Sequence, residues 1–314
     1  MTTEKPKKKK GWKIVLVILA ILAVALVGIY LYADNAPVIS KGYNEKIETG
    51  GTLEAKYIAG GGLSTKKFTA KAEDPIKKYT VYYPEELESS GKTYPMILMV
   101  NGTGFKATKY EPQFELFASW GFIVVGNQDK GTGSGQTTIT TLNYMLAQNA
   151  DPESVFYHKI DVDNIGITGF SQGGAAVFNA LTKFEEAKYF KTAAPLSPVQ
   201  EAGSHTMTDY GYDITGVKCP VLLLAGTEGD FEVKTVIPPE EMFTMYDRMS
   251  VPKVMARHIG MDHDHMMYSA GGYVLAWFRW QLMGDEEAAK AFTGENPELL
   301  TNPLYQDQQI KILE

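Results

Sequence analysis

The sequence has almost no cysteine. Cys219 is the single thiol among 314 residues, so an intramolecular disulfide is excluded and the fold must depend on its hydrophobic core. Cys219 precedes Pro220 and an apolar run, which predicts a buried, unreactive thiol. Cysteine usage therefore does not identify the redox compartment of the protein.

Positive charge is scarce beyond the first 13 residues. Those residues hold six of the 30 Lys and Arg but one of the 37 Asp and Glu, so the rest of the chain has a net charge of −12, against −7 for the whole. An acidic body repels phosphate backbones, which argues against nucleic acid as a partner. A hydrophobic content of 44% is that of a globular protein and argues against disorder.

Long hydrophobic runs are also rare, and the one present is uncharged over residues 14–32. As a helix it would match the bilayer core of about 30 Å. A lysine cluster precedes it, and Trp12, Tyr30 and Tyr32 stand where interfacial aromatics occur, which predicts a single-pass anchor with a cytoplasmic N-terminus and an extracytoplasmic body. The alternative is secretion after signal-peptide cleavage, although the run is longer than the usual apolar region and no A-x-A site follows.

The remaining chain predicts one domain of the α/β class. Residues 1–13 are a basic tail, 14–32 the transmembrane anchor, 33–52 a polar linker and 53–314 the catalytic domain. Short apolar runs alternate with helical patterns, which is typical of a mostly parallel sheet with helices on both faces. The expected strands are residues 53–58, 80–83, 96–100, 122–125, 165–168, 192–196, 221–225 and 254–257.

Ser171 is the candidate nucleophile. Residues 169–173, Gly-Phe-Ser-Gln-Gly, match G-x-S-x-G and stand between the expected strand 165–168 and a run of small residues. In a sharp strand-to-helix turn this motif raises the serine hydroxyl above the sheet, and the following helix directs its positive end at the reacting oxygen. The alternative is a connecting loop without a catalytic role.

His263 is the favoured general base, because a serine hydroxyl needs a base to take its proton. His158 and His205 lie in polar connecting segments, and His258 lies at the end of the last expected strand, where a structural role is expected. His263 and His265 belong to the loop that follows this strand. His265 is the second candidate for the base. A metal site at residues 262–265 is a weaker alternative, since four consecutive ligands seldom converge on one ion.

The carboxylate that orients the base is expected after the strand 221–225. Asp230 is favoured there and Glu228 is second. The order Ser171, Asp230, His263 along the chain is the order in which this fold presents its triad. No metal or cofactor is needed for this chemistry.

Backbone amides must stabilise the oxyanion that forms during acyl transfer. One donor is expected to be the amide of Gln172, directly after the nucleophile. The second is expected from residues 101–105, Asn-Gly-Thr-Gly-Phe, whose glycines allow close approach of the backbone to a ligand. Thr103 is the first choice in that loop and Gly104 the second.

With these motifs the sequence resembles the α/β-hydrolase superfamily, in the branch of chlorophyllases, dienelactone hydrolases and bacterial cutinases or polyester hydrolases. The resemblance covers about residues 82–284. It rests on residues 101–105, 116–122, 169–174, 226–230, 260–263 and 273–278. It implies an eight-stranded, mostly parallel sheet, hydrolysis of carboxylic esters through an acyl-enzyme, and no cofactor.

Some positions differ from that branch. Polyester hydrolases have Pro-Gly-Phe or Pro-Gly-Tyr in the oxyanion loop, a methionine after the nucleophile and a C-terminal disulfide, where this chain has residues 101–105, Gln172 and one cysteine. Dienelactone hydrolases use cysteine in place of Ser171. The sequence thus predicts a carboxylesterase-like enzyme and leaves a small-molecule or lipid-like substrate open. Alternatives are a serine peptidase or acyltransferase on the same fold, or a membrane-anchored pseudohydrolase that only binds.

Overall fold

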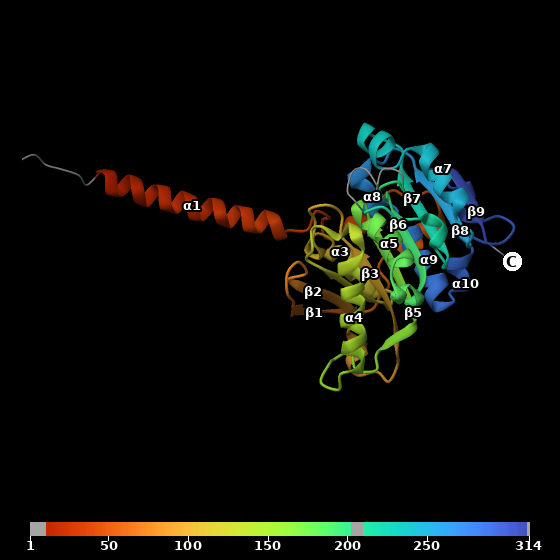
Figure 1. Cartoon of the computed structure of the whole chain (residues 1–314), viewed down its shortest axis with the longest axis horizontal. Helices are drawn as coiled ribbons and strands as arrows, with labels where there is room; N and C mark the ends of the chain where they lie inside the picture. Colours follow the sequence, from red (N-terminus) through yellow and green to blue (C-terminus); the bar gives the residue numbers. More distant parts are fainter. Residues whose placement is uncertain (1–10, 202–209, 313–314) are drawn as a thin grey trace, which may run out of the picture.

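A nine-stranded sheet forms the centre of the domain in the computed structural model, which describes residues 11–201 and 210–312. The strand order is β1-β2-β4-β3-β5-β6-β7-β8-β9 (Figure 1). The strands are β1 (Thr65–Lys71), β2 (Lys78–Pro84), β3 (Tyr94–Val100), β4 (Ile123–Asn127), β5 (Ile160–Phe170), β6 (Phe190–Leu196), β7 (Val221–Gly226), β8 (Lys253–His258) and β9 (Tyr305–Lys311).

Parallel pairing dominates the middle of this sheet and antiparallel pairing its two ends. Strands β4, β3, β5, β6, β7 and β8 pair in parallel. At the ends, β2 pairs antiparallel with β1 and β4, and β9 pairs antiparallel with β8. The predicted fold class, a mostly parallel α/β sheet of the α/β-hydrolase kind, is confirmed.

Helices cover both faces of the sheet and bury a hydrophobic core on each side (Figure 1). One core lies under α4 (Gln136–Ala150), α5 (Gln172–Thr182) and α7 (Pro239–Arg248). The other lies under α2 (Thr52–Ile58), α3 (Glu111–Ser119), α8 (His263–Ser269) and α9 (Gly271–Met283). The short helices α10 (Glu286–Ala289) and α11 (Glu298–Thr301) follow. Cys219 is buried as predicted, and burial raises the pKa of its thiol to about 12.

One expected strand is wrong. Residues 53–58 belong to helix α2, because Leu53, Tyr57 and Ile58 place their side chains on one helical face and the intervening Glu54, Ala55 and Lys56 suit a helix. The two outermost strands, β1 and β9, were not expected. Both are partly exposed along their length, as edge strands usually are, so neither has the apolar pattern that indicates a buried strand.

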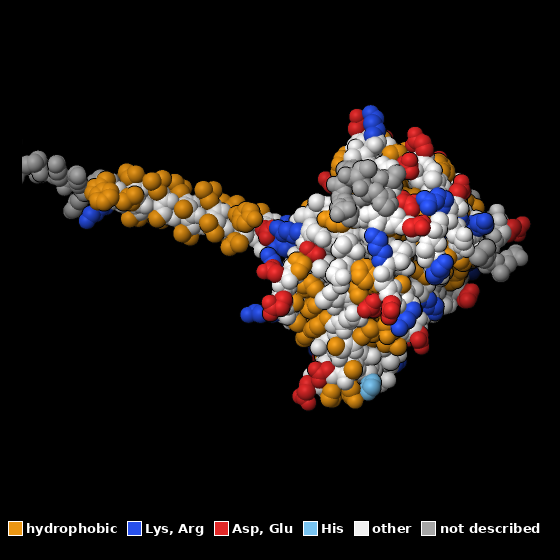
Figure 2. All heavy atoms as spheres, viewed as in Figure 1, with side chains coloured by type: hydrophobic (Ala, Val, Ile, Leu, Met, Phe, Trp, Pro, Cys, Tyr) orange, Lys and Arg blue, Asp and Glu red, His pale blue; other side chains and the backbone are white. Residues whose placement is uncertain are grey.

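Helix α1 (Gly11–Asn35) extends away from the domain (Figure 1). Within the described ranges it is the one helix long and apolar enough to cross a membrane, over Trp12–Asn35 with a mean hydropathy of 3.2, and the domain buries none of it. Figure 2 shows apolar side chains exposed along this helix. The segment after it packs onto the domain, since Ile39 and Tyr43 are buried in the core beside α2.

Candidate active site

Ser171 stands at the turn between β5 and α5. Its backbone has φ 59° and ψ −121°, a region that residues with a side chain seldom adopt. Its amide donates to the carbonyl of Leu196, and its own carbonyl accepts from Gly174. The strained conformation is therefore held by bonds on both sides, which fixes the hydroxyl at the carboxyl end of the central strand.

The glycines of the motif allow this turn to pack. A methyl group at Gly169 would overlap the carbonyl oxygen of Gly173, and one at Gly173 would overlap the carbonyl oxygen of Val100. A methyl group at Gly174 would come within 2.7 Å of Cα of Pro198. Only glycine fits at these positions, because the obstructing atoms belong to the backbone.

His263 contacts the serine hydroxyl. It is the first residue of α8, and its Nε2 lies 2.9 Å from Oγ of Ser171. The imidazole is packed between aromatic rings: Phe170 lies 4.6 Å away, centroid to centroid, and Phe231 meets it edge-on at 5.0 Å. The structure thus brings two sequence-predicted residues, separated by 92 positions, into one hydrogen bond.

The other nitrogen of His263 faces Glu232, a residue that the sequence analysis missed. Its Oε2 lies 2.6 Å from His263 Nδ1. Oε1 accepts from the hydroxyl of Ser197 at 2.6 Å and from the amide of Gly226 at 2.7 Å. Glu232 is fully buried, so these bonds fix both oxygens. An ionised carboxylate only accepts, which places the imidazole proton on Nδ1 and leaves the lone pair of Nε2 for the serine O–H.

The expected carboxylate, Asp230, does not reach His263. Its side chain is 83% exposed and pairs with Lys234 at 2.8 Å. Glu228, the second choice, is also exposed. The prediction is corrected to Glu232 because residues 231–236 form a π-helix, η7 (Phe231–Val236), that turns the side chain of Glu232 inward. The one sequence signal for Glu232 is its position between two apolar residues, Phe231 and Val233.

The other histidines lie elsewhere. His265 is 54% exposed at its side chain, and its Nδ1 pairs with Asp262 at 2.7 Å. Asp262 caps α8 by accepting from the amide of His265. His258 is buried beside Tyr305, with ring centroids 4.5 Å apart. His205 lies outside the described residues. In the described part of the chain no group of three or more His, Cys, Asp or Glu could hold a metal ion.

The amides of the two expected oxyanion donors have no hydrogen-bond acceptor among the described residues. Gln172 is the first residue of α5, where an N–H has no partner within its helix. Thr103 is exposed, and its amide has no hydrogen-bond partner in the residues described. Gly104, the second choice, donates its amide to the carbonyl of Lys130 at 3.0 Å. The geometry therefore favours Thr103 over Gly104.

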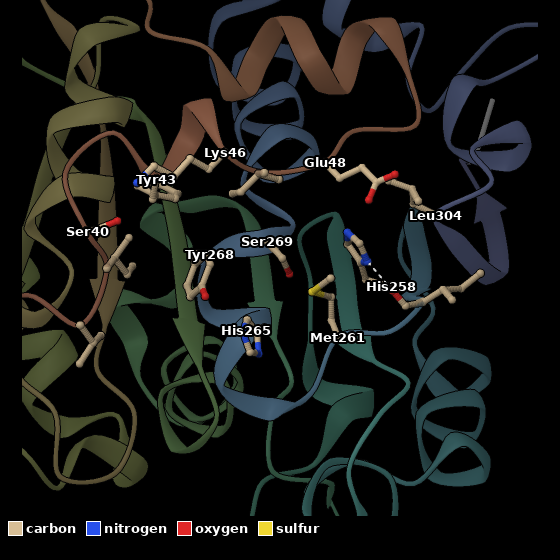
Figure 3. Close-up of a pocket in the computed structure, with 14 residues that line it drawn as sticks. Ser40, Tyr43, Lys46, Glu48, His258, Met261, His265, Tyr268, Ser269 and Leu304 are labelled. Carbon is tan, nitrogen blue, oxygen red and sulfur yellow. Dashed lines mark hydrogen bonds between the residues drawn. The ribbon is translucent and has the colours of Figure 1, made fainter.

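A cavity of about 480 Å³ borders helix α8 and the residues just before it. None of Ser171, His263 and Glu232 lines this cavity. Figure 3 shows residues of the segment after α1 on one side, and residues before and within α8 on the other. The first side includes Ser40, Tyr43, Lys46 and Glu48, and the second Met261, His265 and Tyr268. The cavity therefore touches the neighbours of His263 without containing its ring.

The sheet, the strained serine turn and the histidine that contacts the serine hydroxyl are those of a serine hydrolase of the α/β-hydrolase superfamily. Comparison with protein families agrees: the PET hydrolase-like family (PETase) matches residues 51–308. The chain belongs to this family, which confirms the resemblance to the polyester-hydrolase branch, and membership implies a serine hydrolase that acts on esters. No curated protein matches the chain.

Proposed function

We propose that the protein is a carboxylesterase-like serine hydrolase whose triad is Ser171, His263 and Glu232. The observation that carries the proposal is the continuous path from hydroxyl to imidazole to buried carboxylate, with distances of 2.9 Å and 2.6 Å. All three groups are buried or nearly so, where water competes little for these hydrogen bonds. A pseudohydrolase would have no need for such an arrangement.

The reaction has two halves. Ser171 Oγ attacks the ester carbonyl carbon while its proton passes to His263 Nε2, and the resulting imidazolium is stabilised by Glu232. The tetrahedral intermediate then expels the alcohol, which takes that proton, and an acyl-serine remains. In the second half water attacks the acyl-serine, His263 again accepts a proton and returns it to Ser171 Oγ, and the carboxylic acid leaves. No cofactor takes part in these steps.

The oxyanion of both tetrahedral intermediates needs two donors. We assign these to the amides of Thr103 and Gln172, since neither has an acceptor of its own among the described residues. Gln172 directly follows the nucleophile, and the loop of Thr103 packs on the nucleophile turn through Gly102 and Phe170. The first turn of α5 adds the positive end of the helix dipole. Loss of one such donor typically lowers kcat by about 10² to 10³.

We also propose that α1 anchors the enzyme with its N-terminus in the cytoplasm and its domain outside. The support is the uncharged run of residues 14–32, the lysines before it and the absence of burial by the domain. Protease added to intact cells should digest the domain. Protection of the domain until the cells are lysed would contradict this topology.

Labelling with a fluorophosphonate followed by peptide mapping tests the chemistry. The reagent should modify Ser171, and the protein should hydrolyse p-nitrophenyl acetate. Ser171→Ala should abolish both while the domain remains folded, since the hydroxyl lies at the rim of the sheet. Modification of a different residue, or full turnover by Ser171→Ala, would contradict the proposed nucleophile.

A further inference from the structure

The domain end of α1 is held by three lysines. Asp34 forms ion pairs with Lys106 and with Lys130, the latter at 2.8 Å. Lys109 donates to the carbonyls of Ala33 at 2.5 Å and Ala36 at 3.1 Å. We call these three lysines and Asp34 the anchor clasp. Figure 2 shows basic side chains gathered where the helix meets the domain.

The clasp lies close to the expected edge of the bilayer core. The uncharged run ends at Tyr32, and Asp34 follows within the same helix, so it is about 3 Å further along the axis. The headgroup layer on each side of the core is about 5–7 Å thick. The clasp lysines therefore lie at headgroup level, where lysine side chains are favoured.

The clasp is continuous with the active site. Lys106 directly follows the oxyanion loop, residues 101–105, and the carbonyl of Lys130 accepts the amide of Gly104 in that loop at 3.0 Å. The loop in turn packs on the nucleophile turn, because a methyl group at Gly102 would lie 3.1 Å from the ring of Phe170. A continuous series of contacts thus joins the end of α1 to the nucleophile turn, and the segment that follows α1 packs on the domain through Ile39 and Tyr43.

From this geometry we infer that the edge of the sheet that carries Ser171, here called the catalytic rim, is held at the membrane surface. The substrate is then an ester within that surface, an amphiphile or lipid whose carbonyl group lies near the headgroups. The inference rests on the proposed esterase activity and anchor, and it specifies the substrate class. Hydrolysis of such an ester depends on the distance between the rim and the bilayer, whereas hydrolysis of a water-soluble ester does not.

The test compares two substrates that release the same leaving group, p-nitrophenol. The full chain is reconstituted in phosphatidylcholine vesicles and assayed with dissolved p-nitrophenyl acetate and with p-nitrophenyl palmitate incorporated in the vesicles. In the variant, a spacer of 12 Gly and Ser residues is inserted between Tyr32 and Ala33, which leaves the clasp intact and separates it from the span by about 20 Å. The matched control carries the same spacer between Lys10 and Gly11, on the other side of the membrane.

The Tyr32 spacer should lower turnover of the vesicle-resident ester at least tenfold and change turnover of p-nitrophenyl acetate by less than twofold. The Lys10 spacer should change neither. Equal turnover of the resident ester by the Tyr32 spacer variant and the unmodified chain would overturn the inference alone. Absence of p-nitrophenyl acetate turnover in the unmodified chain would instead overturn the proposed function, and failure to co-float with vesicles would overturn the anchor.

Discussion

Two fully buried glutamates, Glu232 and Glu54, accept hydrogen bonds from almost the same kinds of donor but are expected to have different roles. Glu232 accepts from the hydroxyl of Ser197, the amide of Gly226 and the imidazole of His263. Glu54, in α2, accepts from the hydroxyl of Tyr305 at 2.8 Å, the amide of Gly50 at 2.9 Å and the side-chain amide of Asn302 at 2.8 Å. Each carboxylate therefore has one hydroxyl, one backbone donor and one side-chain nitrogen donor.

The difference lies in the third donor. An imidazole that gives one N–H to Glu232 has a second nitrogen free to accept a proton from Ser171, whereas the amide of Asn302 cannot relay a proton. Instead Asn302 also donates to the hydroxyl of Tyr273 and so joins α2 to α9 and the C-terminal strand. Burial of a carboxylate therefore does not by itself indicate catalysis, and the chemistry of its partner decides between a catalytic and a structural role.

The largest expected loss of activity comes from removing Ser171 or His263, the two groups between which the proton moves. Ser171→Ala and His263→Ala should each lower kcat on the order of 10⁴ or more, because neither group acts without the other. The double variant should be hardly worse than the worse single variant. Steady-state and single-turnover assays measure the losses. Near-normal turnover of His263→Ala at neutral pH would exclude His263 as the base.

The next effect concerns the carboxylate itself. Glu232→Gln should lower kcat by about 10³ to 10⁴, since a neutral amide has no charge to stabilise the imidazolium and can donate its own N–H to Nδ1, which favours the wrong tautomer of His263. Asp230→Asn is the matched control, because Asp230 is exposed and pairs only with Lys234 among the described residues. It should keep activity within twofold. The reverse pattern in an esterase assay would assign the role to Asp230 instead.

Glu54→Gln should have the opposite profile. The NH₂ group of the amide would face either the N–H donors of Gly50 and Asn302, in place of Oε2, or the hydroxyl of Tyr305, in place of Oε1. Loss of such a buried acceptor costs about 1–3 kcal/mol of unfolding free energy. Activity per folded molecule should change by less than twofold. Denaturant unfolding of the full chain in detergent, followed in parallel with esterase assays, measures both quantities. A large loss of kcat in a folded Glu54→Gln protein would remove the contrast with Glu232.

The same variant tests the pH dependence of stability. Burial raises the pKa of Glu54 above its usual value of 4.5, so just above pH 4.5 the folded chain binds more protons than the unfolded chain. The contribution of Glu54 to stability is therefore full below pH 4.5 and falls as the pH rises through its folded pKa. The unfolding free energy of the unmodified protein, relative to Glu54→Gln, should decrease over that range. A constant difference would show that the folded and unfolded pKa values are equal.

The smallest expected effect concerns Phe231, the residue before Glu232. Its ring is 57% exposed and meets His263 edge-on, so it offers an apolar surface to a bound substrate. Phe231→Ala should raise KM for an apolar ester about fivefold, which corresponds to about 1 kcal/mol of lost contact, and leave kcat within twofold. An unchanged KM would show that Phe231 does not contact the substrate.

The sequence predicted what local patterns determine. Gly169 to Gly173 define a strand, a turn and a helix start within a few residues, so these residues and their immediate neighbours suffice to make Ser171 the candidate nucleophile. His263 follows from its position after the last parallel strand, β8. The apolar run of residues 14–32 likewise needs no tertiary information, and the structure makes it a helix. In each case the signal lies within about 20 residues of sequence.

The sequence did not predict what long-range contacts determine. Helix α2 was expected to be a strand, and its first amides, those of Leu53 and Glu54, are satisfied by the carboxylate of Glu298, 244 or more residues away. Glu232 lies six residues beyond the end of β7 in a π-helix, a rare conformation. Its role depends on Ser197 and His263, neither of which is near it in sequence.

The packing around the nucleophile also restricts how this chain can diverge during evolution. At Gly169 and Gly173 any side chain meets backbone oxygen rather than a neighbour that could shrink in compensation. A library that randomises the two positions should therefore return glycine at both, whereas most of the apolar residues of β5 are exchangeable for others of similar volume. Distant homologues would share the four-residue interval between these glycines long after overall sequence identity had faded.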